Sequence, residues 1–136
     1  MALLDVNALV ALAWDAHVHH EAMSAWFDQR QGPWATCAVS EAGFVRVSSN
    51  PKVIVGALSI VEARNVLRDL CGIGEHRFLV NDVSMADADL PPMVGHRQVT
   101  DGLLLTVARR AGVPLVTFDA ALVTLAGGDD VELLRR

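Results

Sequence analysis

Apolar positions along the chain follow two different spacings. Short apolar runs predict β-strands at residues 2–5, 34–36, 77–80, 113–118 and 131–134. Between these runs, apolar residues recur every three or four positions, which predicts amphipathic helices at residues 7–14, 18–29, 39–48, 59–71, 99–111 and 120–126. Because helices separate successive strands, the connections are crossovers. We therefore expect an α/β fold with a mainly parallel central sheet of four to five strands in a three-layer α/β/α arrangement.

Helix boundaries follow from residues that start or stop a helix. Asn7 is expected to cap the first helix, which leaves Asp5 at the end of its strand without a structural role. Gly32-Pro33 is expected to end the second helix, and Gly112 the helix over 99–111.

Composition fits one domain over residues 1–136, since 52% of the residues are apolar and only 20% are charged, which excludes disorder. No apolar run approaches the ~18 residues of a membrane span. Asp5 interrupts the apolar N-terminus, so no signal peptide is expected. Cys37 and Cys71 have no metal-binding spacing, and we expect reduced thiols in a cytoplasmic protein.

The net charge of −5 argues against a broad basic surface that holds nucleic acid. It leaves a nuclease open, because a bound cation would neutralise part of the acidic charge. An acidic domain without a nucleic-acid partner stays the alternative at this point.

Four acids occupy the positions where the chain passes from a strand or loop into a helix: Asp5, Glu41, Asp101 and Asp119. In an open α/β sheet, ligands bind beyond the carboxyl ends of the strands, so these distant acids are expected to meet in one pocket. Clustered carboxylates stay ionised only beside a cation, and oxygen ligands suit Mg²⁺ or Mn²⁺. Taken singly, each acid has another reading as a helix cap or first-turn residue. The joint pattern favours a metal-dependent hydrolase of phosphodiesters.

The motifs that carry these acids resemble those of the PIN domain, and more narrowly those of the VapC toxins of bacterial toxin–antitoxin pairs. They are Leu4-Asp5-Val6-Asn7, Ser40-Glu41, Thr100-Asp101-Gly102-Leu103-Leu104 and Thr117-Phe118-Asp119. Residues 44–51 and 96–101 are also similar to stretches that accompany the acids in that subfamily. The resemblance covers the chain from Met1 to about residue 134.

The resemblance implies a PIN-like fold and a ribonuclease that uses Mg²⁺ or Mn²⁺ and leaves a 5′-phosphate and a 3′-hydroxyl. Carried over by position, Asp5 and Asp101 would bind the metal directly, while Glu41 and Asp119 would complete the cluster. Asn7 would orient Asp5, and Thr117 would offer a hydroxyl to the cluster.

Two arginines are candidates for contacts with phosphate. Arg97 lies four residues before Asp101 and is the better placed. Arg46 follows Glu41 by five residues, about 140° round a helix at ~100° per residue, so the two are not expected to share a face.

Partners follow from the resemblance and from composition. An RNA substrate and a cognate antitoxin are implied, and the antitoxin is expected to bring an arginine to the acidic pocket. The high apolar content favours a homodimer, with the helices at residues 18–29 and 59–71 as candidate interfaces. No membrane partner is expected.

Other classes of protein fit the sequence less well. A dehalogenase-type phosphatase needs an acid where the chain has Asn7, and a receiver domain needs a late lysine, whereas Lys52 is the only lysine. His17, His19 and His20 complete no zinc pattern. A small metal-dependent phosphatase and a catalytically inactive PIN-like binding module remain the alternatives.

Overall fold

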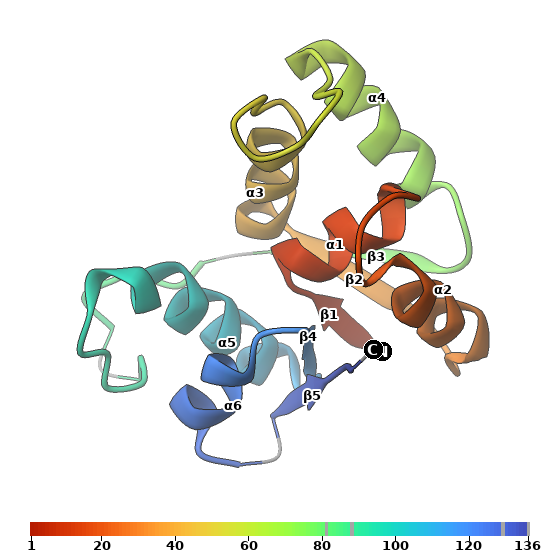
Figure 1. Ribbon diagram of the computed structural model, residues 1–136. Coiled ribbons are helices and arrows are strands. Elements are labelled where there is room, and N and C mark those ends of the chain that lie inside the picture. Colours follow the sequence, from red (N-terminus) through yellow and green to blue (C-terminus); the bar gives the residue numbers. More distant parts are fainter. Residues whose placement is uncertain (81, 88, 129, 136) are drawn as a thin grey trace.

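A central sheet organises the computed structural model, which describes residues 1–80, 82–87, 89–128 and 130–135. Within these residues the sheet has five strands: β1 (Ala2–Leu4), β2 (Trp34–Cys37), β3 (His76–Leu79), β4 (Leu115–Thr117) and β5 (Val131–Leu133). They lie in the order β3-β2-β1-β4-β5, and every neighbouring pair is parallel (Figure 1). The predicted α/β fold with a mainly parallel sheet is confirmed.

The helices of the described residues lie close to their predicted ranges. They are α1 (Val6–Ala13), α2 (His20–Gln29), α3 (Ala38–Ser48), α4 (Ile60–Cys71), α5 (Val99–Ala111) and α6 (Ala120–Ala126), with a short 3₁₀ turn η1 (His96–Gln98) before α5. The second helix begins two residues later than predicted. The backbone N–H groups of His17 and His20 bond instead to the carbonyls of Trp14 and His17, which forms a turn between α1 and α2.

Local chemistry accounts for several of these boundaries. Ser59 and Glu62 form a capping box at the start of α4, in which each side chain accepts a hydrogen bond from the other residue's backbone N–H. Gly112 ends α5 with a φ of +69°, a left-handed conformation that glycine adopts without steric cost. These signals are local in the sequence, which is why the helix limits could be predicted.

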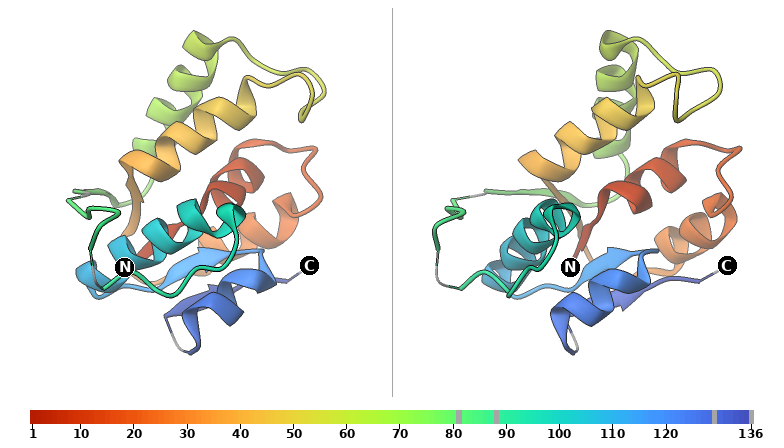
Figure 2. Two further views of the ribbon diagram at one scale, coloured as in Figure 1. Left: turned by 90° about the vertical axis from the view of Figure 1, so that its left-hand side faces the viewer. Right: turned by 60° about the vertical axis from the view of Figure 1, so that its left-hand side comes forward.

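Helices cover both faces of the sheet (Figure 2). Leu4 and Val116 pack in one buried cluster with residues of α1, α2 and α3. Their neighbours Leu3 and Leu115 pack in the other cluster with residues of α5 and α6. Because side chains alternate along a strand, adjacent residues face opposite layers, and strands buried on both sides contain few polar residues. The predicted three-layer α/β/α arrangement is confirmed.

Helix α4 packs on α3 at the outer edge of the molecule rather than over the middle of the sheet (Figure 1). Its only fully buried residue is Ala63, while Ile60 and Val61 are exposed. Among the described residues, no helix combines the length and apolar character that crossing a membrane requires.

Candidate active site

Three of the four acids converge on one cleft at the carboxyl end of the sheet. Asp5 directly follows β1, and Asp119 lies two residues beyond the end of the adjacent strand β4. Asp101, in the first turn of α5, completes the group. The cleft has a volume of about 340 Å³, and its polar lining consists of Asp5, Asn7, His17, Arg46, Thr100, Asp101 and Asp119.

Asp5 is buried, with 4% of its surface exposed, and both its carboxylate oxygens are hydrogen-bonded. Oδ1 accepts a bond from the backbone N–H of Val6 at 2.7 Å, and Oδ2 accepts one from the hydroxyl of Thr117 at 2.7 Å. Asp5 is therefore the N-cap of α1, and the expectation that Asn7 caps this helix is wrong. Burial raises the pKa of Asp5, and the charge of Asp119 adds to this, while the two hydrogen bonds oppose it.

Asn7 and Thr117 hold the two strand ends together instead. The amide of Asn7 donates to the hydroxyl of Thr117 at 3.1 Å, and its oxygen accepts a bond from the backbone N–H of Phe118 at 3.2 Å. The same hydroxyl accepts a bond from the backbone N–H of Asp119 at 3.0 Å. Thr117 thus connects two of the acids, and its hydroxyl proton is directed at Asp5.

Replacing Thr117 with valine is expected to destabilise the fold by about 1–3 kcal/mol, because the buried carboxylate of Asp5 loses a donor while the side-chain volume stays the same. Urea denaturation measures the change in the free energy of unfolding. Thr124→Val on the exposed face of α6 is the matched control and should change it by less than about 0.5 kcal/mol. Equal effects of the two substitutions would show that the Thr117 hydroxyl contributes nothing to holding Asp5.

Asp101 has the most perturbed ionisation in the cleft. It is half-buried, and its pKa is raised to about 6, first by burial and then by the negative charges of Asp5 and Asp119. Asp119 is exposed and caps α6 by accepting a bond from the backbone N–H of Ala121 at 2.9 Å. The cleft therefore concentrates negative charge that a cation would neutralise.

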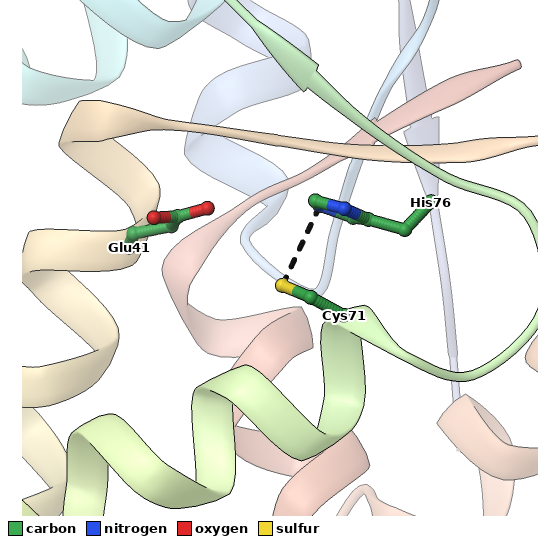
Figure 3. A group of neighbouring side chains, drawn as sticks. All are labelled: Glu41, Cys71 and His76. Carbon is green, nitrogen blue, oxygen red and sulfur yellow. Dashed lines mark hydrogen bonds between the residues drawn. The ribbon is translucent and has the colours of Figure 1, made fainter.

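Glu41 does not line this cleft. It accepts a hydrogen bond from the hydroxyl of Thr36 at 2.5 Å and lies beside Cys71 and His76 (Figure 3). Gly43 explains the direction, because this glycine packs so closely on Val6 of α1 that a Cβ there would clash. Two residues correspond to about 200° of helix rotation, so Glu41 lies on the side of α3 opposite this contact with α1.

The same rotation brings Arg46 towards the cleft. Arg46 follows Gly43 by three residues, or about 300° of helix rotation, so its side chain lies within about 60° of the direction in which Gly43 faces α1. Arg46 lines the acidic cleft and also the neighbouring apolar hollow between α3 and α4 that Glu41 lines. Arg97, the arginine favoured from the sequence, lies exposed in η1 and is not among the residues that line the cleft. The structure therefore favours Arg46 over Arg97.

His17 lines the cleft but was not among the site residues predicted from the sequence. It lies in the turn after α1, and burial together with the neighbouring His19 and His20 lowers its pKa, which favours the neutral imidazole. His19 stacks on Phe118, with ring centroids 4.3 Å apart, so the turn packs against the segment that follows β4. The three histidines are visible in the sequence. That their turn lies near Asp119 follows from the pairing of β1 with β4, which the sequence alone did not predict.

Comparison with known proteins places this α/β fold and acidic cleft in a defined class. The sequence model of the family described as PIN domain matches residues 2–128. The crystal structure of the sarcin-ricin loop cleaving toxin VapC20 from Mycobacterium tuberculosis superimposes with a TM-score of 0.65 and 14% identity, over 96% of this chain and 98% of that one. FitAcB from Neisseria gonorrhoeae superimposes with a TM-score of 0.63 and 18% identity, over 96% of each chain. At such identities these two structures support the fold.

Relatives with higher sequence identity define a narrower group within this family. The chain is 61% identical over 127 residues to ribonuclease VapC38 of Mycobacterium tuberculosis (strain ATCC 25618 / H37Rv), covering 93% of this chain and 90% of the relative. It is 42% identical over 137 residues to ribonuclease VapC39 of strain CDC 1551 / Oshkosh, covering 98% and 99%. The chain belongs to the PIN domain family and, within it, to the VapC ribonuclease toxins.

Proposed function

We propose that this chain cleaves RNA at the acidic cleft with the help of Mg²⁺ or Mn²⁺, leaving a 5′-phosphate and a 3′-hydroxyl. The observation that carries the proposal is the convergence of Asp5, Asp101 and Asp119 in one cleft, where burial, and after it the charges of the other two acids, raises the pKa of Asp101. Membership of the VapC ribonucleases supports RNA as the substrate.

The donor atoms of the cleft fit a hard divalent cation. They are carboxylate oxygens, which magnesium and manganese prefer, and no thiol lines the cleft among the described residues. Asp5 and Asp101 would hold the ion directly, with Asp119 beside them. When bound, such an ion supplies Lewis-acid activation of the phosphodiester and of the attacking water.

The protein's own side chains position these acids and the substrate. Thr117 and Asn7 fix the orientation of Asp5, as outer partners of metal ligands commonly do. Arg46 is the cation placed to contact a phosphate of the RNA. Glu41 is proposed as an outer acid of the same site, since it and Arg46 line the same hollow next to the cleft.

Cleavage of a purified RNA with and without EDTA tests this proposal. We expect cleavage with Mg²⁺ or Mn²⁺, its loss in EDTA and its recovery when the ion is restored, with ends mapped as a 5′-phosphate and a 3′-hydroxyl. Cleavage that continues in EDTA would refute the metal-dependent mechanism. Hydrolysis of a phosphomonoester without cleavage of RNA would favour the phosphatase, and no hydrolysis at all would favour the inactive module.

Arg46→Gln is expected to lower kcat/KM for RNA roughly tenfold and to weaken its dependence on salt, because a cation that contacts a phosphate is lost. Arg97→Gln is the matched control, since Arg97 is exposed and does not line the cleft. Initial rates at several salt concentrations measure both variants. A larger loss of kcat/KM with Arg97→Gln would show that Arg97 is the main phosphate contact, as the sequence predicted.

We also propose that a cognate antitoxin covers the cleft and the adjoining hollow and that the chain forms a homodimer. The hollow is about 620 Å³ and is lined by apolar residues of α3, α4 and β3, including the exposed Ile60 and Phe78. An arginine from the antitoxin would supply positive charge to the acids. Co-expression with the neighbouring gene should yield a complex without ribonuclease activity, and its mass should reveal whether the toxin is paired with itself. Continued cleavage by the complex would contradict this account.

A further inference from the structure

A second group of potential metal ligands lies outside the acidic cleft. Glu41 on α3, Cys71 at the end of α4 and His76 at the start of β3 each offer one ligand atom, and these atoms all lie within 4.8 Å of one another (Figure 3). All three residues are half-buried. The cluster thus joins two helices to β3, which is an edge strand of the sheet.

Its dimensions match tetrahedral coordination of zinc. With Zn–S of ~2.3 Å and Zn–N of ~2.0–2.1 Å, the tetrahedral angle places the two ligand atoms about 3.6 Å apart. The distance between Cys71 Sγ and His76 Nε2 is 3.6 Å. The two ligand atoms are therefore already as far apart as two ligands of one tetrahedral zinc ion would be.

The surroundings hold the ligands in place. The buried hydroxyl of Thr36 donates to Glu41 at 2.5 Å and so orients its carboxylate. The same hydroxyl lies 2.8 Å from His76 Nε2, and an ion that binds this nitrogen replaces that contact. The buried indole of Trp34 donates to the carbonyl of Ile73, within the turn between α4 and β3, and its ring contacts that of His76 at 4.7 Å between centroids. This turn separates the cysteine from the histidine, so Trp34 fixes the spacing of both ligands.

The donor chemistry differs from that of the acidic cleft. A thiolate and an imidazole select zinc and similar borderline ions, whereas carboxylates alone suit magnesium. The chain thus presents two groups of potential ligands, one made of hard oxygen donors alone and one that also offers sulfur and nitrogen.

We propose that Glu41, Cys71 and His76 form a zinc site, with three protein ligands and a fourth position open to water. The ion would connect α3, α4 and the edge strand β3. It would also hold Glu41 away from the acidic cleft, so zinc should lower ribonuclease activity. This last effect rests on the proposed function, whereas the site itself does not.

Cobalt binding tests the site without any measurement of activity. Thiolate coordination to Co²⁺ gives a charge-transfer absorption, and Cys37→Ser provides a background in which Cys71 is the only thiol. Serine should be tolerated at residue 37, because this residue occupies the N-cap position of α3, where serine is favoured. We expect the band to saturate at one equivalent of Co²⁺ and to be displaced by Zn²⁺.

Further variants assign the ligands. Cys71→Ser should abolish the band, and His76→Asn and Glu41→Gln should each weaken binding at least about tenfold. His96→Asn, which removes an exposed histidine far along the chain, is the control and should leave affinity unchanged. Circular dichroism would verify that each variant is folded. Absence of the band in the Cys37→Ser protein, or Zn²⁺ affinity unchanged by Cys71→Ser, would overturn the proposal. Zinc inhibition that persists in Cys71→Ser would refute only the link to activity.

Discussion

Asp101→Asn is expected to lower kcat/KM for RNA cleavage more than about a hundredfold. Substitution of a residue that only supports a metal ligand commonly lowers metal affinity or activity 10–100-fold, and loss of a ligand itself should have a larger effect. The amide keeps the shape of the side chain but loses the charge that attracts the cation. Asp28→Asn, an identical charge change on the exposed face of α2, is the control and should cleave like the wild type. Initial rates at saturating Mg²⁺ measure the effect.

Asp101 is a better test of the metal site than Asp5. The carboxylate of Asp5 caps α1 and accepts the hydroxyl bond of Thr117, so its substitution also disturbs the fold. Full activity of the Asp101→Asn protein would show that Asp101 is not one of the proposed metal ligands.

The same substitution is expected to stabilise the metal-free protein at neutral pH. Folded Asp101 keeps its proton up to a pKa of about 6, whereas the unfolded chain loses it near the ordinary value of 3.8. Between these values the folded state binds more protons, so the free energy of unfolding falls as pH rises. The penalty is complete above pH 6 and is absent well below pH 4.

Solvent screening limits the size of this effect, since Asp101 is only half-buried, and a favourable interaction with the N-terminus of α5 opposes it. We expect a net gain of about 1 kcal/mol for Asp101→Asn at pH 7.5 in EDTA, or roughly 3 °C in Tm. The gain should shrink to a small part of this at pH 4 and vanish only well below that pH. Adding Mg²⁺ should raise the Tm of the wild type alone, because the ion binds its folded state.

Thermal melts at both pH values, with and without Mg²⁺, measure these differences. If Asp101→Asn melts below the wild type in EDTA at pH 7.5, the charge of Asp101 serves mainly to start α5. A catalytic role for Asp101 predicts that Asp101→Asn lowers the cleavage rate and raises the Tm in EDTA. A purely structural role predicts that it lowers the Tm.

The sequence predicted the fold well because its signals are local. Strand and helix limits depend on runs of apolar residues and on caps such as Ser59 and Gly112, which act within a few residues of themselves. The sequence also predicted that Asp5, Asp101 and Asp119 share a cleft, since parallel strands bring their carboxyl ends to the same edge. A helix cap and a place in the cleft are not alternatives, because Asp5 and Asp119 cap helices and also line the cleft.

The directions of side chains on α3 could not be predicted in the same way. They depend on how the helix is rotated against its neighbour, and that rotation is set by the contact between Gly43 and Val6. Without it, neither the position of Arg46 in the cleft nor that of Glu41 beside Cys71 and His76 could be inferred. The cysteine and histidine are five residues apart on either side of a turn, a spacing that matches no established metal motif.

The position of β1 in the middle of the sheet has a consequence during synthesis of the protein. This strand is made before the other four strands of the sheet, but one of its two neighbours, β4, is the fourth strand to be made. The cleft needs both, because Asp5 and Asp119 come from opposite ends of the chain. A nascent chain therefore has no assembled acidic cleft until β4 and Asp119 have been made. A protein of a ribonuclease family thus assembles its acidic cleft only after more than a hundred codons beyond Asp5 have been translated.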